Sequence, residues 1–205
     1  MKILMNGLKK EIKMSREAIL QSIKNNKPDL LPVPQINEDT FAEDINLKDT
    51  FKNNIALVGG TIKEIEKEAI DTEIKTIYSN AKHIVSTTKK SSLGTVLVNK
   101  YTDPHSLEDI DLAIVHGQLG VSENGAIWVT ADNSIVRALP FITNDLVIIL
   151  KKDKLCLHMH QAYDIISQRD RDFGVFISGP SKTADIEQCL VVGAHGAMSL
   201  TVLLV

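Results

Sequence analysis

The chain has 205 residues, 43% of them hydrophobic, which is enough for one α/β-sized domain with an extension. The net charge of −3 and a pI of about 6.1 are not typical of nucleic-acid-binding proteins, so we expect no nucleic-acid partner. Two cysteines, Cys156 and Cys189, without a CxxC motif cannot supply a thiolate zinc or iron–sulfur site by themselves. We therefore expect no metal site and no cofactor bound by this chain.

Targeting signals are weak. The first residues, MKILMNGLKKEIKM, are interrupted by Asn6, Lys9 and Lys10, unlike the continuous apolar stretch of a signal peptide. No apolar run reaches transmembrane length, and the cysteines do not resemble a disulfide framework. We expect a cytoplasmic protein without a membrane span.

The N-terminal part is predicted to be an extension over residues 1–48. Ser15 can cap a helix that runs to about Lys24, and Pro28 follows its end. Pro32 and Pro34 interrupt the next stretch, which therefore reads as a linker. The remaining residues, 49–205, are predicted to form one α/β domain.

Strands and helices alternate at the start of that domain. A helix is expected over 49–57, stopped by Gly59 and Gly60, followed by a strand over 61–65. A helix over 66–80 and a strand over 83–87 come next. This alternation predicts a mostly parallel sheet with helices on both faces.

The middle of the domain reads differently. Apolar stretches over 111–121 and 126–130 flank the turn Ser122-Glu123-Asn124-Gly125, and Asn-Gly between such runs favours a β-hairpin. We expect this antiparallel pair to be built into the sheet. A buried strand over 146–150 and a helix over 157–168 follow.

The last 34 residues, 172–205, carry the most informative pattern. A strand over 175–177 leads through Ser178-Gly179-Pro180-Ser181 to a predicted helix that starts near Thr183 and ends near Gly193, and a strand over 200–205 follows. A strand–turn–helix directs backbone N–H groups and hydroxyls at one point, which is typical of an anion site. Helix capping by Ser181 or Thr183, with Asp185 and Glu187 in the first turn, explains the same residues equally well.

Other residues have a functional and a structural interpretation. Glu123 could be a nucleophile or general base in a dry pocket, although a solvated hairpin turn is the more common case. His195, close to Gly193 and Gly196, could orient a ligand or act as an acid or base, whereas an ordinary loop histidine is more common. Arg137 could clamp a carboxylate, but a surface ion pair is favoured.

Several of these stretches together resemble a known family. ISGPSKTADIE and VVGAHG, with DLAIVHGQLGVSENGAIWVT before them, are similar to the lactate-utilization members of the LUD-domain family. The resemblance implies a Rossmann-like mixed, mostly parallel sheet like that of CoA transferases and ribose-5-phosphate isomerase. It also implies a subunit that helps to oxidise L-lactate to pyruvate with iron–sulfur partner proteins, itself carrying no cluster.

A second resemblance supports an alternative. Ser122-Glu123-Asn124-Gly125 is similar to the signature of class I CoA transferases, whose glutamate attacks an acyl-CoA thioester. The alternative is a stand-alone acyl- or CoA-transferase-like enzyme that uses Glu123 as nucleophile or base. A third hypothesis is a domain that serves interaction only and binds no ligand. The chain could also form an oligomer. For a small carboxylate or other anion, the predicted ligand-binding residues, at the carboxyl ends of the strands, are Asn124, Gly125, Arg137, Ser178, Gly179, Pro180, Ser181, Thr183, Asp185, Glu187, His195 and Gly196.

Overall fold

A computed structural model describes residues 15–32, 34, 37, 40, 44–168, 172–184 and 190–205. The chain divides into residues 1–43 and 44–205, and each part is described by itself. The first part contains helix α1 (Arg16–Asn25), and the Ser15 hydroxyl accepts a hydrogen bond from the Ala18 N–H at 3.2 Å, as a helix cap does. The predicted helix is therefore confirmed, while the predicted domain boundary at residue 48 stays a prediction.

The helices of the second part agree with most of the predicted positions. Asn46 caps the first of them by accepting hydrogen bonds from the N–H groups of Lys48 and Asp49. The α-helices and short 3-10 helices of this part are α2 (Leu47–Leu57), η2 (Lys67–Ala69), α3 (Ile70–Ile77), η3 (Pro104–Leu107), α4 (Ala131–Ser134), α5 (Leu139–Ile142) and α6 (Met159–Ser167).

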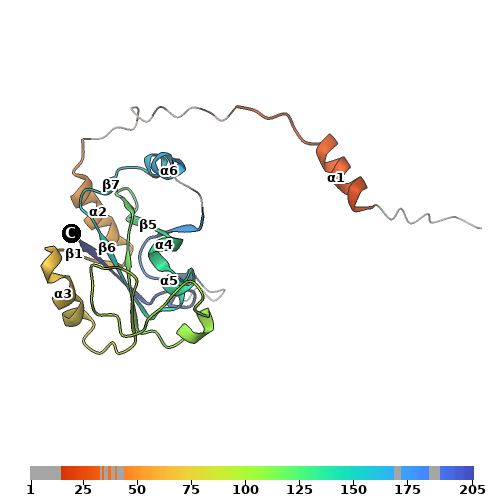
Figure 1. Ribbon diagram of the computed structural model, residues 1–205. Coiled ribbons are helices and arrows are strands. Elements are labelled where there is room, and N and C mark those ends of the chain that lie inside the picture. The colour runs from red at the N-terminus through yellow and green to blue at the C-terminus, as the bar shows by residue number, and fades with distance from the viewer. Residues whose placement is uncertain are drawn as a thin grey trace, which may run out of the picture. The chain divides into compact units, whose positions relative to one another are not determined.

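A parallel five-stranded sheet forms the centre of the described fold (Figure 1). Its spatial order is β1 (Thr61–Glu64), β11 (Ser199–Leu204), β6 (Asp145–Leu150), β3 (Leu112–His116) and β2 (Ile84–Ser86). The last strand of the chain is thus inserted between β1 and β6, with Thr201 opposite Thr61 and Ser199 opposite Asp145. The predicted α/β class with a mostly parallel sheet is confirmed.

The predicted hairpin exists but lies in a second sheet. That sheet contains β7 (Leu155–Cys156), β4 (Leu119–Val121), β5 (Ala126–Thr130) and β8 (Gly174–Ile177), and β4 pairs antiparallel with β5. The single strand expected over 111–121 breaks at Gly117. A side chain at Gly117 would lie 2.6 Å from Ile127 and 3.0 Å from Ile148, so the chain passes from one sheet to the other where the two sheets touch.

The two faces of the central sheet are covered differently. Alternation along β6 sends Leu146, Ile148 and Leu150 toward α2 and the second sheet, whereas Val147 and Ile149 pack with the α3 cluster. Helix α6 contributes Ala162 to a third apolar cluster with residues of β4 and β5. One face of the parallel sheet therefore carries α3, and the other carries α2 together with a sheet, which sequence alternation alone did not indicate.

The helix predicted from Thr183 to Gly193 is wrong. Strands β9 (Lys182–Ala184) and β10 (Leu190–Val192) instead pair antiparallel, with Thr183 opposite Val191. Consecutive β-branched residues at 191 and 192 favour a strand, and the Gly193 N–H extends the hairpin by donating to the Ser181 carbonyl at 3.0 Å. The predictions for Asp185 and Glu187 lie outside the described residues.

Candidate functional site

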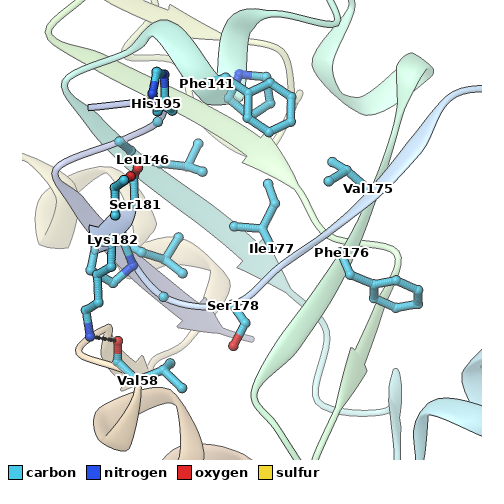
Figure 2. Close-up of a pocket in the computed structure, with 17 residues that line it drawn as sticks. Val58, Phe141, Leu146, Val175, Phe176, Ile177, Ser178, Ser181, Lys182 and His195 are labelled. Atoms are coloured by element: carbon cyan, nitrogen blue, oxygen red, sulfur yellow. Dashed lines mark hydrogen bonds between the residues drawn. The ribbon is translucent and has the colours of Figure 1, made fainter. Parts of the chain in front are cut away.

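The residues predicted around the 178–181 turn do gather around one cavity, which we call the 178–183 pocket (Figure 2). It has a volume of about 560 Å³. Its polar rim comes from the turn, β9 and the loop before β11. Apolar side chains of β6, β8, α5 and β11 complete it. The lining includes Val58, Pro140, Phe141, Leu146, Val175, Ile177, Ser178, Gly179, Pro180, Ser181, Lys182, Thr183, His195, Gly196 and Leu200.

Strand β8 delivers the chain to this pocket. Val175 and Ile177 are partly buried against the main core, while Phe176 points away and packs on Trp128 with ring centroids 4.7 Å apart. The strand ends at Ile177, Ser178 follows it, and Gly179 turns the chain with a φ of +74°. An added Cβ at Gly179 would lie 2.6 Å from the Val58 carbonyl oxygen, so the close approach of the turn to the end of α2 requires glycine here.

The position of the pocket differs from the prediction. Leu146 and Leu200, which line it, are the second residues of β6 and β11, so the pocket lies beside the amino-terminal ends of these strands. The Ser181 N–H donates to the Ala197 carbonyl at 2.8 Å and ties the turn to the segment that enters β11. The turn was expected at the carboxyl ends of the parallel strands. It follows β8, however, which belongs to the second sheet, so the direction of the parallel strands does not determine the position of the turn.

Cationic and hydroxyl groups dominate the polar part of the pocket. Lys182 Nζ donates to the Val58 carbonyl at 2.6 Å and so caps the C-terminus of α2, which keeps the ammonium group at the rim. His195 is exposed and also lines the pocket. Among the described residues that line the pocket there is no aspartate or glutamate. This charge pattern suits an anion with an apolar portion.

Lys182 and Phe141 were not singled out from the sequence. A lysine inside Ser181-Lys182-Thr183 is a signal that could have been used, because a cation between two hydroxyls suits an anion. Phe141 gave no such signal, since an apolar residue after Pro140 is equally expected in a core.

Asn124 and Gly125 lie next to the pocket without lining it. The Ser178 hydroxyl donates to the Asn124 carbonyl at 2.8 Å and joins the pocket turn to the β4–β5 turn. Gly125 has a φ of +67°, and an added Cβ would lie 3.1 Å from the Ile55 nitrogen of α2. Asn124 and Gly125 therefore help to hold the pocket turn in position and do not themselves line the pocket.

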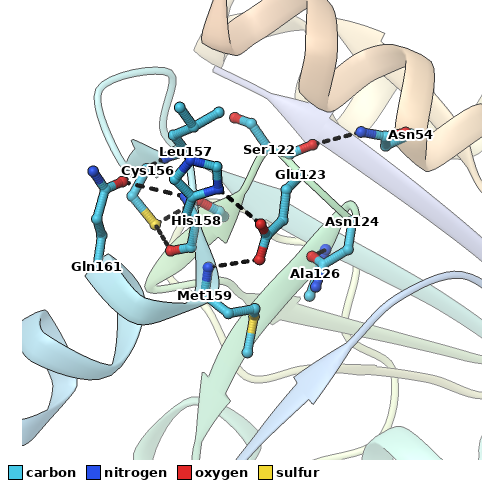
Figure 3. A network of polar contacts seen from close by, with 11 residues as sticks. Asn54, Ser122, Glu123, Asn124, Ala126, Cys156, Leu157, His158, Met159 and Gln161 are labelled. Atoms are coloured by element: carbon cyan, nitrogen blue, oxygen red, sulfur yellow. Dashed lines mark hydrogen bonds and ion pairs between the residues drawn. The ribbon is translucent and has the colours of Figure 1, made fainter. Parts of the chain in front are cut away.

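Glu123 belongs to a separate polar network (Figure 3). One carboxylate oxygen lies 2.8 Å from His158 Nδ1, and the other accepts from the Met159 N–H at 2.7 Å. Met159 is the first residue of α6, so the carboxylate sits at the positive end of this helix. Gln161 completes the cap by accepting from the N–H groups of Leu157 and His158.

The electrostatics of Glu123 fit this capping arrangement. Partial burial acts to raise the pKa of Glu123, but the hydrogen bonds from His158 and the Met159 N–H act in the opposite direction and leave the pKa lowered. An ionised carboxylate with both oxygens engaged is a poor general base. Its side chain is still 36% exposed, so a role as nucleophile stays a prediction.

Arg137 is not brought to the pocket. Its guanidinium binds both carboxylate oxygens of Asp172, at 2.8 and 3.1 Å, and lies over the Phe173 ring. The side chains of Arg137 and Asp172 are 60% and 72% exposed. The arrangement is the surface ion pair that the sequence favoured over a ligand clamp.

The described residues contain neither a cluster of metal-ligating side chains nor a membrane-spanning helix. No three histidine, cysteine, aspartate or glutamate side chains among them are arranged to hold a metal ion. None of the helices in the described part is long and apolar enough to cross a membrane.

Comparisons with known proteins agree with the fold. Proteins named lactate utilization protein C from Bacillus velezensis and Bacillus subtilis are each 31% identical over 105 residues, which is 48% of this chain and 43% of each relative. The aligned stretch thus spans less than half of those relatives. A solved DUF162 family protein from Deinococcus radiodurans superposes with a TM-score of 0.59 and 14% identity, covering 83% of this chain and 99% of that one. The LUD domain model matches residues 16–205, so the chain belongs to the LUD-domain family.

Proposed function

We propose that this chain takes part in lactate utilization and that the 178–183 pocket binds the carboxylate of a small 2-hydroxy or 2-oxo acid, such as L-lactate or pyruvate. The observation that carries the proposal is a pocket that gathers Ser178, Ser181, Lys182 and His195 with no acidic side chain in its described lining. Membership of the LUD-domain family and the names of the relatives, lactate utilization protein C, support the choice of acid.

The size of the pocket supports a role within a larger assembly. A volume of about 560 Å³ is in the range of ligand pockets and exceeds a three-carbon acid. With such a small acid bound, the apolar side, with Val175, Ile177 and Phe141, would be covered by a partner surface.

The redox chemistry would be carried by partner proteins. Oxidation of L-lactate to pyruvate releases two electrons and two protons, so an electron acceptor is required. A cubane or two-iron cluster takes four ligands that are mostly thiolates, and this sequence holds two cysteines. The proposal therefore assigns iron–sulfur clusters to partner subunits and assigns no cluster to this chain.

The binding step is tested by calorimetric or NMR titration of the protein with L-lactate and with pyruvate. Removing the ammonium in Lys182→Met should weaken binding about tenfold or more, since a charge-assisted hydrogen bond contributes roughly 1.5–3 kcal/mol. Lys154→Met, which removes an exposed lysine outside the pocket, is the matched control and should bind as the wild type does. Equal affinities for the wild type and Lys182→Met would refute the pocket assignment.

The acyl-transfer alternative has its own test. An acyl–enzyme anhydride at Glu123 would make the protein sensitive to hydroxylamine only in the presence of an acyl-CoA. Glu123→Gln should abolish that sensitivity. Inactivation of the wild type without acyl-CoA, or its persistence in Glu123→Gln, would contradict a covalent role for this glutamate.

A further inference from the structure

Three basic side chains lie at the carboxyl ends of neighbouring parallel strands. His116 is the last residue of β3, Lys151 directly follows β6, and Lys90 lies in the loop that leaves β2. In the sheet these strands are adjacent in the order β6, β3, β2. Their carboxyl ends share one edge of the sheet, away from the strand ends beside the 178–183 pocket, and this edge is where open α/β sheets bind ligands.

The hydrogen bonds of His116 define which ring nitrogen carries a proton. Nδ1 lies 2.9 Å from the Ile149 carbonyl oxygen, which can only accept, so we assign the proton to Nδ1. Lys90 Nζ is 3.5 Å from the same nitrogen, and this contact therefore brings two donors together. In the neutral ring, Nε2 is left as an acceptor, and no hydrogen bond to it occurs among the described residues.

Positive charge accumulates here without a carboxylate in contact. Within the described part of the chain, no acidic oxygen lies within 4 Å of the ammonium groups of Lys90, Lys151 or Lys67. The adjacent Lys152 differs, because it pairs with Glu64 at 3.4 Å. Lys90 is half-buried, so its charge is less well solvated than that of an ordinary surface lysine.

The pKa directions agree with this crowding. Burial lowers the pKa of Lys90, the charges of Lys151 and Lys67 lower it further, and Asp153 acts in the opposite direction. Burial also lowers the pKa of His116, and the charges of Lys90 and Lys151 lower it further, while the hydrogen bond with the Ile149 carbonyl acts in the opposite direction. A bound anion would relieve both effects.

We propose that Lys90, His116 and Lys151 form a binding site for a phosphate group, carried by inorganic phosphate or by a phosphate monoester. A phosphate carries a charge of about −1.5 to −2 at neutral pH and so matches two ammonium groups, whereas a carboxylate matches one. Lysines bind phosphate as point charges and need no bidentate geometry. The acceptor Nε2 of His116 suits a protonated phosphate oxygen or a hydroxyl of the ester.

The test is an NMR titration of the His116 ring protons against pH, with phosphate or with chloride at equal ionic strength. Phosphate should raise the pKa of His116 in the wild-type protein, because a nearby anion favours the imidazolium. Lys90→Gln and Lys151→Gln should each weaken phosphate binding by about tenfold or more, while Lys100→Gln, an exposed lysine in a loop, should bind as the wild type does.

The outcomes separate the possible ligands. A shift that saturates with phosphate but not with acetate supports the site, and a tighter shift with a phosphate monoester identifies the ester as the better ligand. No saturable shift with phosphate, an equal shift with acetate, or unchanged binding in Lys90→Gln would overturn the proposal. Lys182→Met should leave phosphate binding unaltered. The phosphate titration therefore tests this site separately from the 178–183 pocket.

Discussion

Gly179 offers a sharp test of how the pocket turn is built. Its φ of +74° lies in the left-handed region, which costs an L-residue roughly 1–2 kcal/mol. The added methyl group of Gly179→Ala would also lie 2.6 Å from the Val58 carbonyl oxygen and 3.0 Å from Val58 Cγ2. Relieving that overlap requires the turn to move from the end of α2, and such overpacking typically costs about 1–3 kcal/mol.

Together these contributions predict a loss of about 3 kcal/mol in the free energy of unfolding. For a domain of this size, 1 kcal/mol lowers the melting temperature by about 2–4 °C, so the expected decrease is roughly 6–12 °C. Thermal unfolding followed by circular dichroism, with urea unfolding for the free energy, measures both quantities.

Gly193→Ala is the matched control. Gly193 has a φ of +84°, and an added Cβ would lie 2.4 Å from Met198 Cγ, so the half-exposed Met198 side chain would have to change rotamer, whereas the contact at Gly179 is with a backbone oxygen. This variant should therefore show the backbone cost of roughly 1–2 kcal/mol and a smaller repacking cost than Gly179→Ala, because an exposed side chain moves more easily than the end of α2. Equal melting temperatures for the two variants, or a Gly179→Ala protein as stable as the wild type, would refute the argument from close packing on Val58.

Three further predictions concern charged groups. Glu123→Gln removes the ion pair with His158 but leaves an oxygen that can accept from the Met159 N–H. Urea unfolding should therefore show a loss of only about 0.5–1 kcal/mol in the free energy of unfolding. A loss several times larger would contradict the capping role. Hydrogen bonds from Lys52 and Lys48 lower the pKa of Glu64 from 4.5 to about 2, so the stability that Glu64 contributes is present above pH 4.5 and is lost as the pH falls toward 2. The difference in stability between the wild type and Glu64→Gln should shrink over that interval, and a constant difference would show that the pKa is not lowered. Arg137→Met should lower the free energy of unfolding by less than about 1 kcal/mol, because Arg137 and its partner Asp172 are both exposed. Lactate binding should be unchanged, because Arg137 does not line the 178–183 pocket. Loss of lactate binding would show that Arg137 belongs to the binding site.

Much of the fold follows from local sequence patterns. The continuous apolar runs of β6 and β11 predict buried parallel strands, and Asn124-Gly125 predicts the β4–β5 hairpin. The sheet to which the hairpin belongs could not be predicted, because it depends on contacts between Gly117 and residues far along the chain.

The error at residues 183–193 has a physical cause. Hydroxyl residues followed by Asp185 and Glu187 match a helix start, but Thr183 pairs with Val191 in a hairpin. Helix-start signals are weak, and tertiary pairing of a β-branched segment can override them.

The likeness to CoA transferases stays a prediction.

The candidate site was predictable in its composition more than in its geometry. The motif indicated that Ser178, Ser181 and His195 would come together, and they line one pocket. The pairing of Glu123 with His158 joins residues 35 positions apart, and no local pattern encodes it. The Lys182 contact with Val58 likewise depends on where α2 ends.

The most direct test of the proposed function is a pull-down of the tagged full-length chain from its native cells grown on L-lactate, followed by assay of the eluate for lactate-dependent dye reduction. We expect iron–sulfur proteins and dye-reducing activity to be recovered together. With Lys182→Met as bait, we expect the same partners and a lower activity at limiting lactate. Recovery of the chain alone, without lactate-dependent reduction, would contradict a role in lactate utilization.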